Sequence, residues 1–145
     1  MTMMAKVIGA NVHRARLARM RNIKTNSQRR LYAAGELVRK EAADSIIAGS
    51  VSGPGHVPSA PGTPPNRDTA NLDKSIDVRP DKGGNKVLVT ARAEYAAAQE
   101  FGTSKLPERP FMRPALRKHR NAIVQGQVQA VQEVVRVVKN KPYAK

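Results

Sequence analysis

The stretch from Glu94 to Lys118, EYAAAQEFGTSKLPERPFMRPALRK, decides the fold of this 145-residue chain. Its alanine-rich start predicts two helical turns over Tyr95–Phe101, which Gly102 ends at the usual place for a helix stop. The prolines that follow stiffen the chain reversal, and the last suits the first turn of a new helix, where its missing N–H costs nothing. We expect Phe111 and Met112 to be buried. The pattern predicts a packing joint between two elements, built from Tyr95, Phe101, Gly102, Pro107, Pro110, Phe111, Met112 and Pro114.

Two longer segments have the apolar periodicity of amphipathic helices. The first is predicted over Ser27–Ala48, and Gly49 ends it. Its stripe comprises Leu31, Ala34, Val38, Ala42 and Ile46, widened by Leu37 and Ile47. The second is predicted over Pro114–Lys139, with a stripe of Leu116, Ile123, Val124, Val128, Val131, Val135 and Val138 and a weak point at Gly126.

Between the two helices the sequence predicts a β-hairpin. Leu72, Ile76 and Val78 alternate with polar residues in a strand that Pro80 closes, and Lys86–Ala91 is a second, β-branched strand. The tract DKGGN between them is a turn signal. A lone hairpin is marginal in water, so it must pack on helices or join strands supplied elsewhere. Phe101, Phe111 and Met112 are expected to fix the joint against it.

These elements predict an α+β fold: an N-terminal helix, a long Pro-rich loop, a small antiparallel sheet built on the hairpin, a short helix and a long C-terminal helix. Residues 1–26 are expected to form a basic arm or short helix. Residues 27–141 are expected to form a single domain with an extended loop at 50–70, followed by a tail at 142–145.

The Pro-rich loop Gly53–Pro65 has five prolines and three glycines in thirteen residues, so it is expected to be extended. Because prolines keep it extended, such a segment can bind a neighbouring subunit at a low cost in conformational entropy. The alternative is that it is a flexible linker. The residues predicted to make this contact between subunits are Gly53, Pro54, Pro58, Pro61, Pro64 and Pro65.

The formal net charge of +15 is concentrated at the two ends of the chain. Residues 1–35 carry eight Lys or Arg and no acidic residue, residues 36–108 carry nine against ten, and residues 109–145 carry nine against one. Such an excess implies an anionic partner, either nucleic acid or an acidic protein surface. The candidate contacts are Arg14, Arg16, Arg19, Arg21, Arg113, Arg117, Lys118 and Arg120. The last four crowd a helix start, where the helix dipole disfavours cations.

No pattern typical of a catalytic or metal site is present in the sequence. The three histidines, His13, His56 and His119, are far apart, there is no cysteine, and the glycines near residue 53 lack the Gly-Lys-Ser/Thr ending of a phosphate-binding loop. We therefore expect no enzyme activity and no cofactor. No apolar run approaches the roughly 20 residues of a membrane span, and the N-terminal arginines do not suit a secretion signal. Neither a basic–aromatic platform nor a known nucleic-acid-binding motif is found.

The segment Tyr95–Leu116, YAAAQEFGTSKLPERPFMRPAL, resembles the gene-product-ten-like tail-component family of lambdoid tailed phages. It matches the family's order of Tyr-Ala, Glu-Phe-Gly-Thr and a Pro-x-Arg-Pro-Phe-x-Arg-Pro-Ala run. The upstream segment Pro61–Ile76 is similar to the family's Pro-rich, Thr-Gly-x-Leu and Ser-Ile segment, with Ala70 where a glycine is usual. The resemblance covers about residues 27–135.

The resemblance implies a non-enzymatic protein of the virion neck, involved in tail completion or head–tail connection and assembled in the host cytoplasm. It implies a ring of six or twelve copies between the portal or adaptor proteins and the tail terminator or tail tube, with genomic double-stranded DNA passing through the lumen. Without the resemblance, the charge favours a basic, sequence-independent nucleic-acid-binding protein. A basic amphipathic protein of a membrane surface is a third and weaker hypothesis, because large apolar anchors are missing.

Overall fold

The computed structural model describes residues 10–49 and 53–139, so residues 1–9 of the expected arm and the expected tail lie outside the described part. The elements in chain order are α1 (Ala10–Ile47), a 3₁₀ turn (Gly53–Gly55), α2 (Asn71–Lys74), β1 (Ile76–Pro80), β2 (Val87–Ala91), α3 (Ala96–Phe101) and α4 (Met112–Lys139). The predicted α+β class is confirmed, with two long helices (α1 and α4), two short ones (α2 and α3) and a two-stranded antiparallel sheet.

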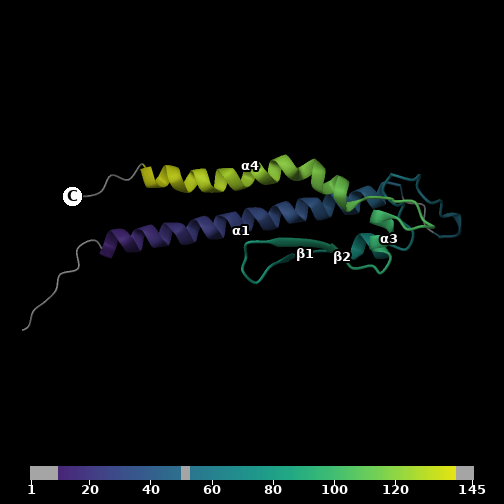
Figure 1. The fold of residues 1–145 in the computed structure, drawn as a ribbon, viewed down its shortest axis with the longest axis horizontal. Coiled ribbons are helices and arrows are strands. Elements are labelled where there is room, and N and C mark those ends of the chain that lie inside the picture. Colours follow the sequence, from purple (N-terminus) through teal and green to yellow (C-terminus); the bar gives the residue numbers. More distant parts are fainter. Residues whose placement is uncertain (1–9, 50–52, 140–145) are drawn as a thin grey trace, which may run out of the picture.

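The two long helices lie side by side and antiparallel, and the hairpin lies along α1 (Figure 1). The Arg30 guanidinium is 2.7 Å from the Glu133 carboxylate, and the Lys118 ammonium is 2.7 Å from Glu41. Because the earlier residue of α1 pairs with the later residue of α4, these contacts fix the antiparallel order. The result is an elongated shaft of α1 and α4 with a small mixed module at one end.

Helix α1 begins at Ala10 rather than at Ser27, so the expectation of a separate N-terminal arm is wrong for residues 10–26. No proline interrupts Ala10–Ile47, and its many Ala, Arg, Leu and Lys residues favour the helix. At 1.5 Å per residue, its 38 residues span about 57 Å.

Leu72 does not belong to the first strand as predicted, because β1 begins only at Ile76. Leu72 lies in α2, and it reaches the core from that single helical turn, with only 5% of its surface exposed. Ala70 immediately before α2 has φ 61° and ψ 13°, the left-handed conformation. This residue turns the chain out of an extended path and into the helical turn. Strands β1 and β2 then pair from Ile76 opposite Ala91 to Pro80 opposite Val87.

The main core lies where α1, α2, the hairpin, α3 and the start of α4 meet. Its buried members are Val38, Ala42, Ile46, Leu72, Ile76, Ala96, Phe111 and Ala115. Leu37 and Ile47 were expected to widen the stripe of α1, but they are 50% and 39% exposed. That expectation is wrong because the elements that cover α1 leave these two side chains outside the contact.

The predicted apolar stripe of α4 does not coincide with the face that this helix buries. The buried residues of α4 are Ala115, Ala130 and Val134, and Ile123 is half-buried. Leu116, Val124, Val128, Val131 and Val135 are all between 46% and 56% exposed, and the side chain of Val138 lies outside the described part. The buried face of α4 thus contains alanines and Val134, and the other valines form a second apolar face that the described residues leave half exposed.

Gly35, near the middle of α1, allows the hairpin to approach the helix closely. A Cβ atom added there would lie 2.8 Å from Val87 Cγ1 and 2.9 Å from Val78 Cγ1. Both valines are β-branched and cannot easily rotate away. By contrast, a Cβ atom added at Gly126 of α4 would meet no atom of another side chain or element within 4 Å.

We predict opposite effects for the two helical glycine variants. Gly126→Ala should raise the free energy of unfolding by roughly 0.5–1 kcal/mol, because alanine favours the helix. Gly35→Ala should lower it, because overpacking costs about 1–3 kcal/mol and exceeds that gain. Urea unfolding followed by circular dichroism measures both. Shifts of the same sign would contradict the close approach at Gly35.

Replacing Ala70 by glycine should stabilise the fold. A left-handed alanine costs about 1 kcal/mol, and glycine adopts this conformation without that strain. The gain should be roughly 0.5–1 kcal/mol in the free energy of unfolding. Ala60→Gly is the control, because Ala60 lies in the same long connection without a positive φ. Equal destabilisation of both variants would show that Ala70 is not left-handed.

Candidate functional site

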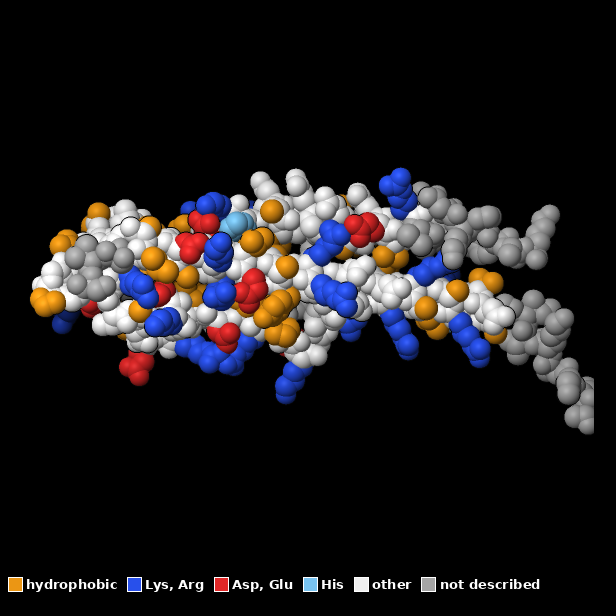
Figure 2. All heavy atoms as spheres, turned by 180° about the vertical axis from the view of Figure 1, so that it is seen from behind, with side chains coloured by type: hydrophobic (Ala, Val, Ile, Leu, Met, Phe, Trp, Pro, Cys, Tyr) orange, Lys and Arg blue, Asp and Glu red, His pale blue; other side chains and the backbone are white. Residues whose placement is uncertain are grey.

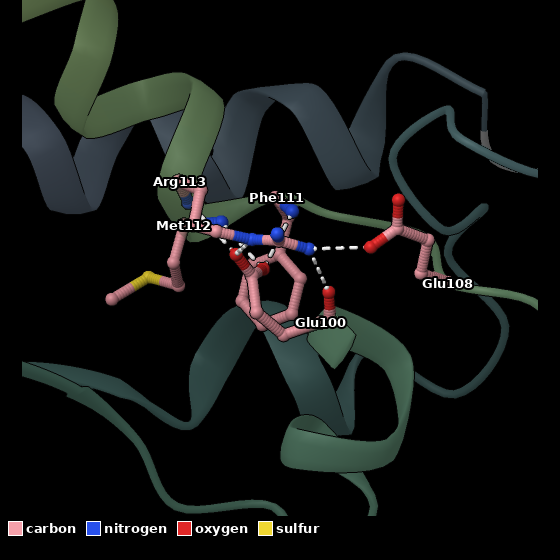
Figure 3. Close-up of polar contacts among 5 residues, drawn as sticks. All are labelled: Glu100, Glu108, Phe111, Met112 and Arg113. Carbon is pink, nitrogen blue, oxygen red and sulfur yellow. Dashed lines mark hydrogen bonds and ion pairs between the residues drawn. The ribbon is translucent and has the colours of Figure 1, made fainter. Parts of the chain in front are cut away.

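The predicted joint centres on Glu100, the last residue but one of α3. Its Oε2 accepts hydrogen bonds from the backbone N–H groups of Phe111 (2.8 Å) and Met112 (2.9 Å), and its Oε1 accepts one from that of Arg113 (2.9 Å) (Figure 3). The first N–H groups of a helix have no partner within the helix. The carboxylate of one helix therefore caps the start of another.

The Arg113 side chain closes the joint from the solvent side. Its Nε donates to Glu100 Oε1 at 3.0 Å, and its Nη2 donates to the Glu100 backbone oxygen at 2.6 Å and to a Glu108 carboxylate oxygen at 2.8 Å. The same guanidinium lies 5.2 Å from the ring centroid of Phe101. One arginine thus ties α3, the Pro-rich turn and the start of α4 together.

Glu100 stays ionised although its side chain is only 6% exposed. Burial alone raises the pKa of a carboxyl group. Here the N–H groups of Phe111, Met112 and Arg113, with the Arg113 side chain, more than offset burial, so the pKa of Glu100 is lowered from its ordinary value near 4.5. The positive end of the α4 dipole acts in the same direction.

Phe111 is buried in the core as predicted, with 1% of its surface exposed, whereas Met112 is only half-buried and packs against the edge of the core. The expectation that Phe101 helps to fix the joint against the hairpin is wrong, since Phe101 is 67% exposed and its ring lies beside Arg113 on the surface. Tyr95 precedes α3 and is 41% exposed. The prolines of the joint stay near the surface: Pro107 and Pro114 are exposed and Pro110 is half-buried.

Gly102 is required by the backbone at the end of α3. Its φ is 71° and its ψ is 178°, a combination that only glycine adopts readily. A Cβ atom added there would also lie 2.9 Å from both the Glu108 nitrogen and the Leu106 oxygen. The turn after α3 therefore folds back tightly onto itself, as the sequence predicts.

The Pro-rich loop is held to the joint of its own chain. The Gly62 N–H donates to the Glu108 oxygen at 2.8 Å, and Arg109 Nε donates to the Ser59 oxygen at 3.0 Å. Pro65 is buried and Pro64 is half-buried, whereas Gly53, Pro54, Pro58 and Pro61 are exposed. The exposed part of the loop remains a candidate contact with another subunit.

The predicted basic cluster at the start of α4 divides into two pairs. Arg113 and Lys118 are held by carboxylates of the same chain, the latter by Glu41. Arg117 and Arg120 are exposed and have no hydrogen bond or ion pair within the described residues. Only this second pair is left for an outside anion.

The four predicted arginines near the start of α1 are also without carboxylate partners in the described part of the chain. Arg14, Arg16 and Arg21 are exposed, and Arg19 is half-buried. Figure 2 shows Lys and Arg side chains projecting from the α1 part of the shaft. These cations lie around the helix and do not form one face. Such an arrangement favours a diffuse electrostatic contact with an anionic partner over sequence-specific binding in a groove of DNA.

A cavity of about 250 Å³ lies between the end of α1, the segment before α2 and the start of α3. Asp73 and Gln99 line it, and each has one buried oxygen without a hydrogen-bond partner among the described residues. The other Asp73 oxygen is 3.4 Å from Arg67 Nη2. The cavity can accept a hydrogen bond from a small donor.

The described residues contain no group of three or more His, Asp or Glu side chains that could hold a metal ion. No helix in residues 10–49 and 53–139 has the length and apolar character that crossing a bilayer requires. The three histidines lie in α1, the Pro-rich loop and α4.

Comparison with protein-family models, curated proteins and solved structures gives no match for this chain.

Sequence reasoning missed the roles of Glu100 and Glu41. The signal for Glu100 was available: α4 has no acidic residue in its first turn, and Phe111 before it cannot accept a hydrogen bond through its side chain. A helix start that lacks its own cap needs an acceptor from elsewhere in the fold. Glu41 gave no comparable signal, because its partner Lys118 is 77 residues away.

Replacing Glu100 by glutamine should lower the free energy of unfolding by about 2–3 kcal/mol at neutral pH, the value of hydrogen bonds to a charged group. Because the folded-state pKa is lowered, this contribution is complete above the unfolded-state pKa and is lost as pH falls through the folded-state pKa. The stability difference between wild type and Glu100→Gln should therefore shrink in acid.

Urea unfolding at neutral and acidic pH measures this difference. Glu94→Gln is the matched control, because Glu94 is exposed and has no hydrogen bond or ion pair within the described residues. A difference for Glu100→Gln that stays constant with pH, or one no larger than the control, would contradict the cap.

Proposed function

We propose that this chain is a non-enzymatic structural subunit of the bacteriophage neck, which forms a ring in tail completion or head–tail connection. The observation that carries the proposal is the coincidence of the phage-like motif with the joint. Residues of the Tyr95–Leu116 motif supply the Glu100 cap, the Gly102 turn and the buried Phe111. The residues of the motif fix the turn and the start of α4 and do not form a reactive site. This is what we expect of a structural subunit in an assembly.

The surface of the isolated chain supports the same proposal. The sheet has two strands only, so both of its edges are open within the described part of the chain. Open edges invite strand addition from a neighbour. Large apolar side chains are also exposed along both long helices, including Leu17, Met20 and Val128. Other copies or other neck proteins would cover such surfaces.

The charge suits a position around DNA. No carboxylate among the described residues pairs with Arg117, Arg120 or the four predicted arginines of α1, Arg14, Arg16, Arg19 and Arg21. In a ring, some of these cations would face the phosphates of the DNA in the lumen or the acidic surfaces of adjacent portal, adaptor or tail proteins.

The same unpaired cations favour a second candidate function, sequence-independent binding of nucleic acid by a free protein. Contacts of this kind are electrostatic, so binding falls steeply as the salt concentration rises. The two functions differ in what the chain does without nucleic acid: only the neck subunit assembles.

Sedimentation and negative-stain imaging of the nuclease-treated protein, at low and at high salt, test the proposal. We expect closed rings of six or twelve copies that persist when salt screens the charge. A monomer under all conditions, binding duplex DNA tightly only at low salt, would contradict the ring and favour the second function.

A further inference from the structure

Helix α4 has two apolar faces, and the described chain covers only one of them. Small and neutral side chains, among them Ala130 and Gln127, face α1. The other face presents Val124, Val128, Val131 and Val135, which are 56%, 48%, 49% and 46% exposed. We refer to these four residues as the valine seam. A helix that is apolar on more than one side belongs inside a larger structure.

The spacing of the valine seam is that of a helix-pairing surface. Steps of four, three and four residues separate its members. This is the heptad spacing that places side chains on one stripe and inserts them between the residues of another helix. The flanking positions next to the stripe are Gln125 and Gln132, which are neutral and exposed.

The absence of charge along most of the seam indicates which kind of partner can cover it. Residues Asn121–Gln132, NAIVQGQVQAVQ, carry no charged side chain, although the whole chain carries a net charge of +15. Two copies of such a chain repel each other wherever cations meet. At the seam, two copies can come into contact without this electrostatic repulsion. Burying its valines away from water also stabilises the contact.

Other classes of occupant fit less well. DNA or RNA would need cations along the contact, whereas Asn121–Gln132 has none and the unpaired Arg117 and Arg120 lie only at one end of the seam. A lipid surface is bound by helices with Lys or Arg beside large aromatic or leucine anchors, whereas this face has valines flanked by glutamines. An acidic protein would find complementary charge only at Arg117 and Arg120, which precede the seam on the same stripe, and none between Asn121 and Gln132.

We propose that the valine seam of α4 is a contact surface between copies of this chain. The inference rests on the proposed function in one respect, that copies associate, and it adds which surface they use. In a closed ring each copy uses two different surfaces, so the seam of one copy contacts a different part of the next.

Charge placed on the seam tests the proposal. Val128→Glu/Val131→Glu should weaken association by about 100-fold or more, because burying unpaired carboxylates is costly. Ala122→Glu/Gln129→Glu is the matched control: it makes the same change in net charge at two exposed positions of the same helix, seven residues apart and off the seam. The control should assemble like the wild type. Circular dichroism checks that both variants keep their helices.

Thiol protection is the second readout, since the chain has no cysteine of its own. Val128→Cys should react with a water-soluble maleimide rapidly in dilute monomer and slowly in the assembly, whereas Ala122→Cys should react rapidly in both. Protection of Cys at position 128 that does not depend on protein concentration would mean that the chain covers its own seam, which would overturn the proposal.

The outcomes separate this inference from the proposed function. Wild-type rings that persist in the Val128→Glu/Val131→Glu variant would overturn the seam and leave the ring standing. A wild-type protein that remains monomeric at every concentration and salt would overturn both. Assembly that is lost in the seam variant and kept in the control supports both.

Discussion

The buried carboxylate of Glu100 is the interaction on which the rest of the structure depends. It belongs to α3, yet it accepts hydrogen bonds from the N–H group of Phe111, just before α4, and from those of Met112 and Arg113, the first two residues of α4; the Arg113 side chain holds it from outside. Phe111, at the same corner, is fixed in the core. Because the start of α4 is held at these points, its direction relative to the hairpin module is fixed there. Buried Ala130 and Val134 and the ion pairs Arg30–Glu133 and Lys118–Glu41 hold the two helices along the shaft, while Val124, Val128, Val131 and Val135 remain exposed.

Much of this fold could be predicted from local sequence. Gly102, the prolines and the alternation in Ile76–Val78 act through the backbone of their own segment, so their consequences follow from their identity. The cap by Glu100 could not be found in this way, because its partners are eleven to thirteen residues away and depend on how the turn folds. The burial of Val128 was mispredicted for a related reason. Periodicity identifies an apolar face but does not say whether the same chain covers it.

The same reasoning links the charge to assembly. A chain with a net charge of +15 keeps its copies apart unless their contacts avoid the cations. Two of its uncharged tracts are the Pro-rich loop Gly53–Pro65 and Asn121–Gln132 on α4, whereas unpaired arginines lie on α1 and at Arg117 and Arg120. Apolar, neutral surfaces suit contacts between copies, and cationic ones suit DNA or acidic neighbours. This division of the surface is what the proposed neck subunit requires.

Hydrogen exchange at the backbone amides of Phe111, Met112 and Arg113 measures the central interaction most directly. If Glu100 accepts their hydrogen bonds, these amides exchange as slowly as those of core residues such as Ala42, although the first amides of a helix have no partner within the helix. Exchange as rapid as that of the exposed turn at Lys105 would contradict the account, because the start of α4 would then be uncapped and its direction unfixed.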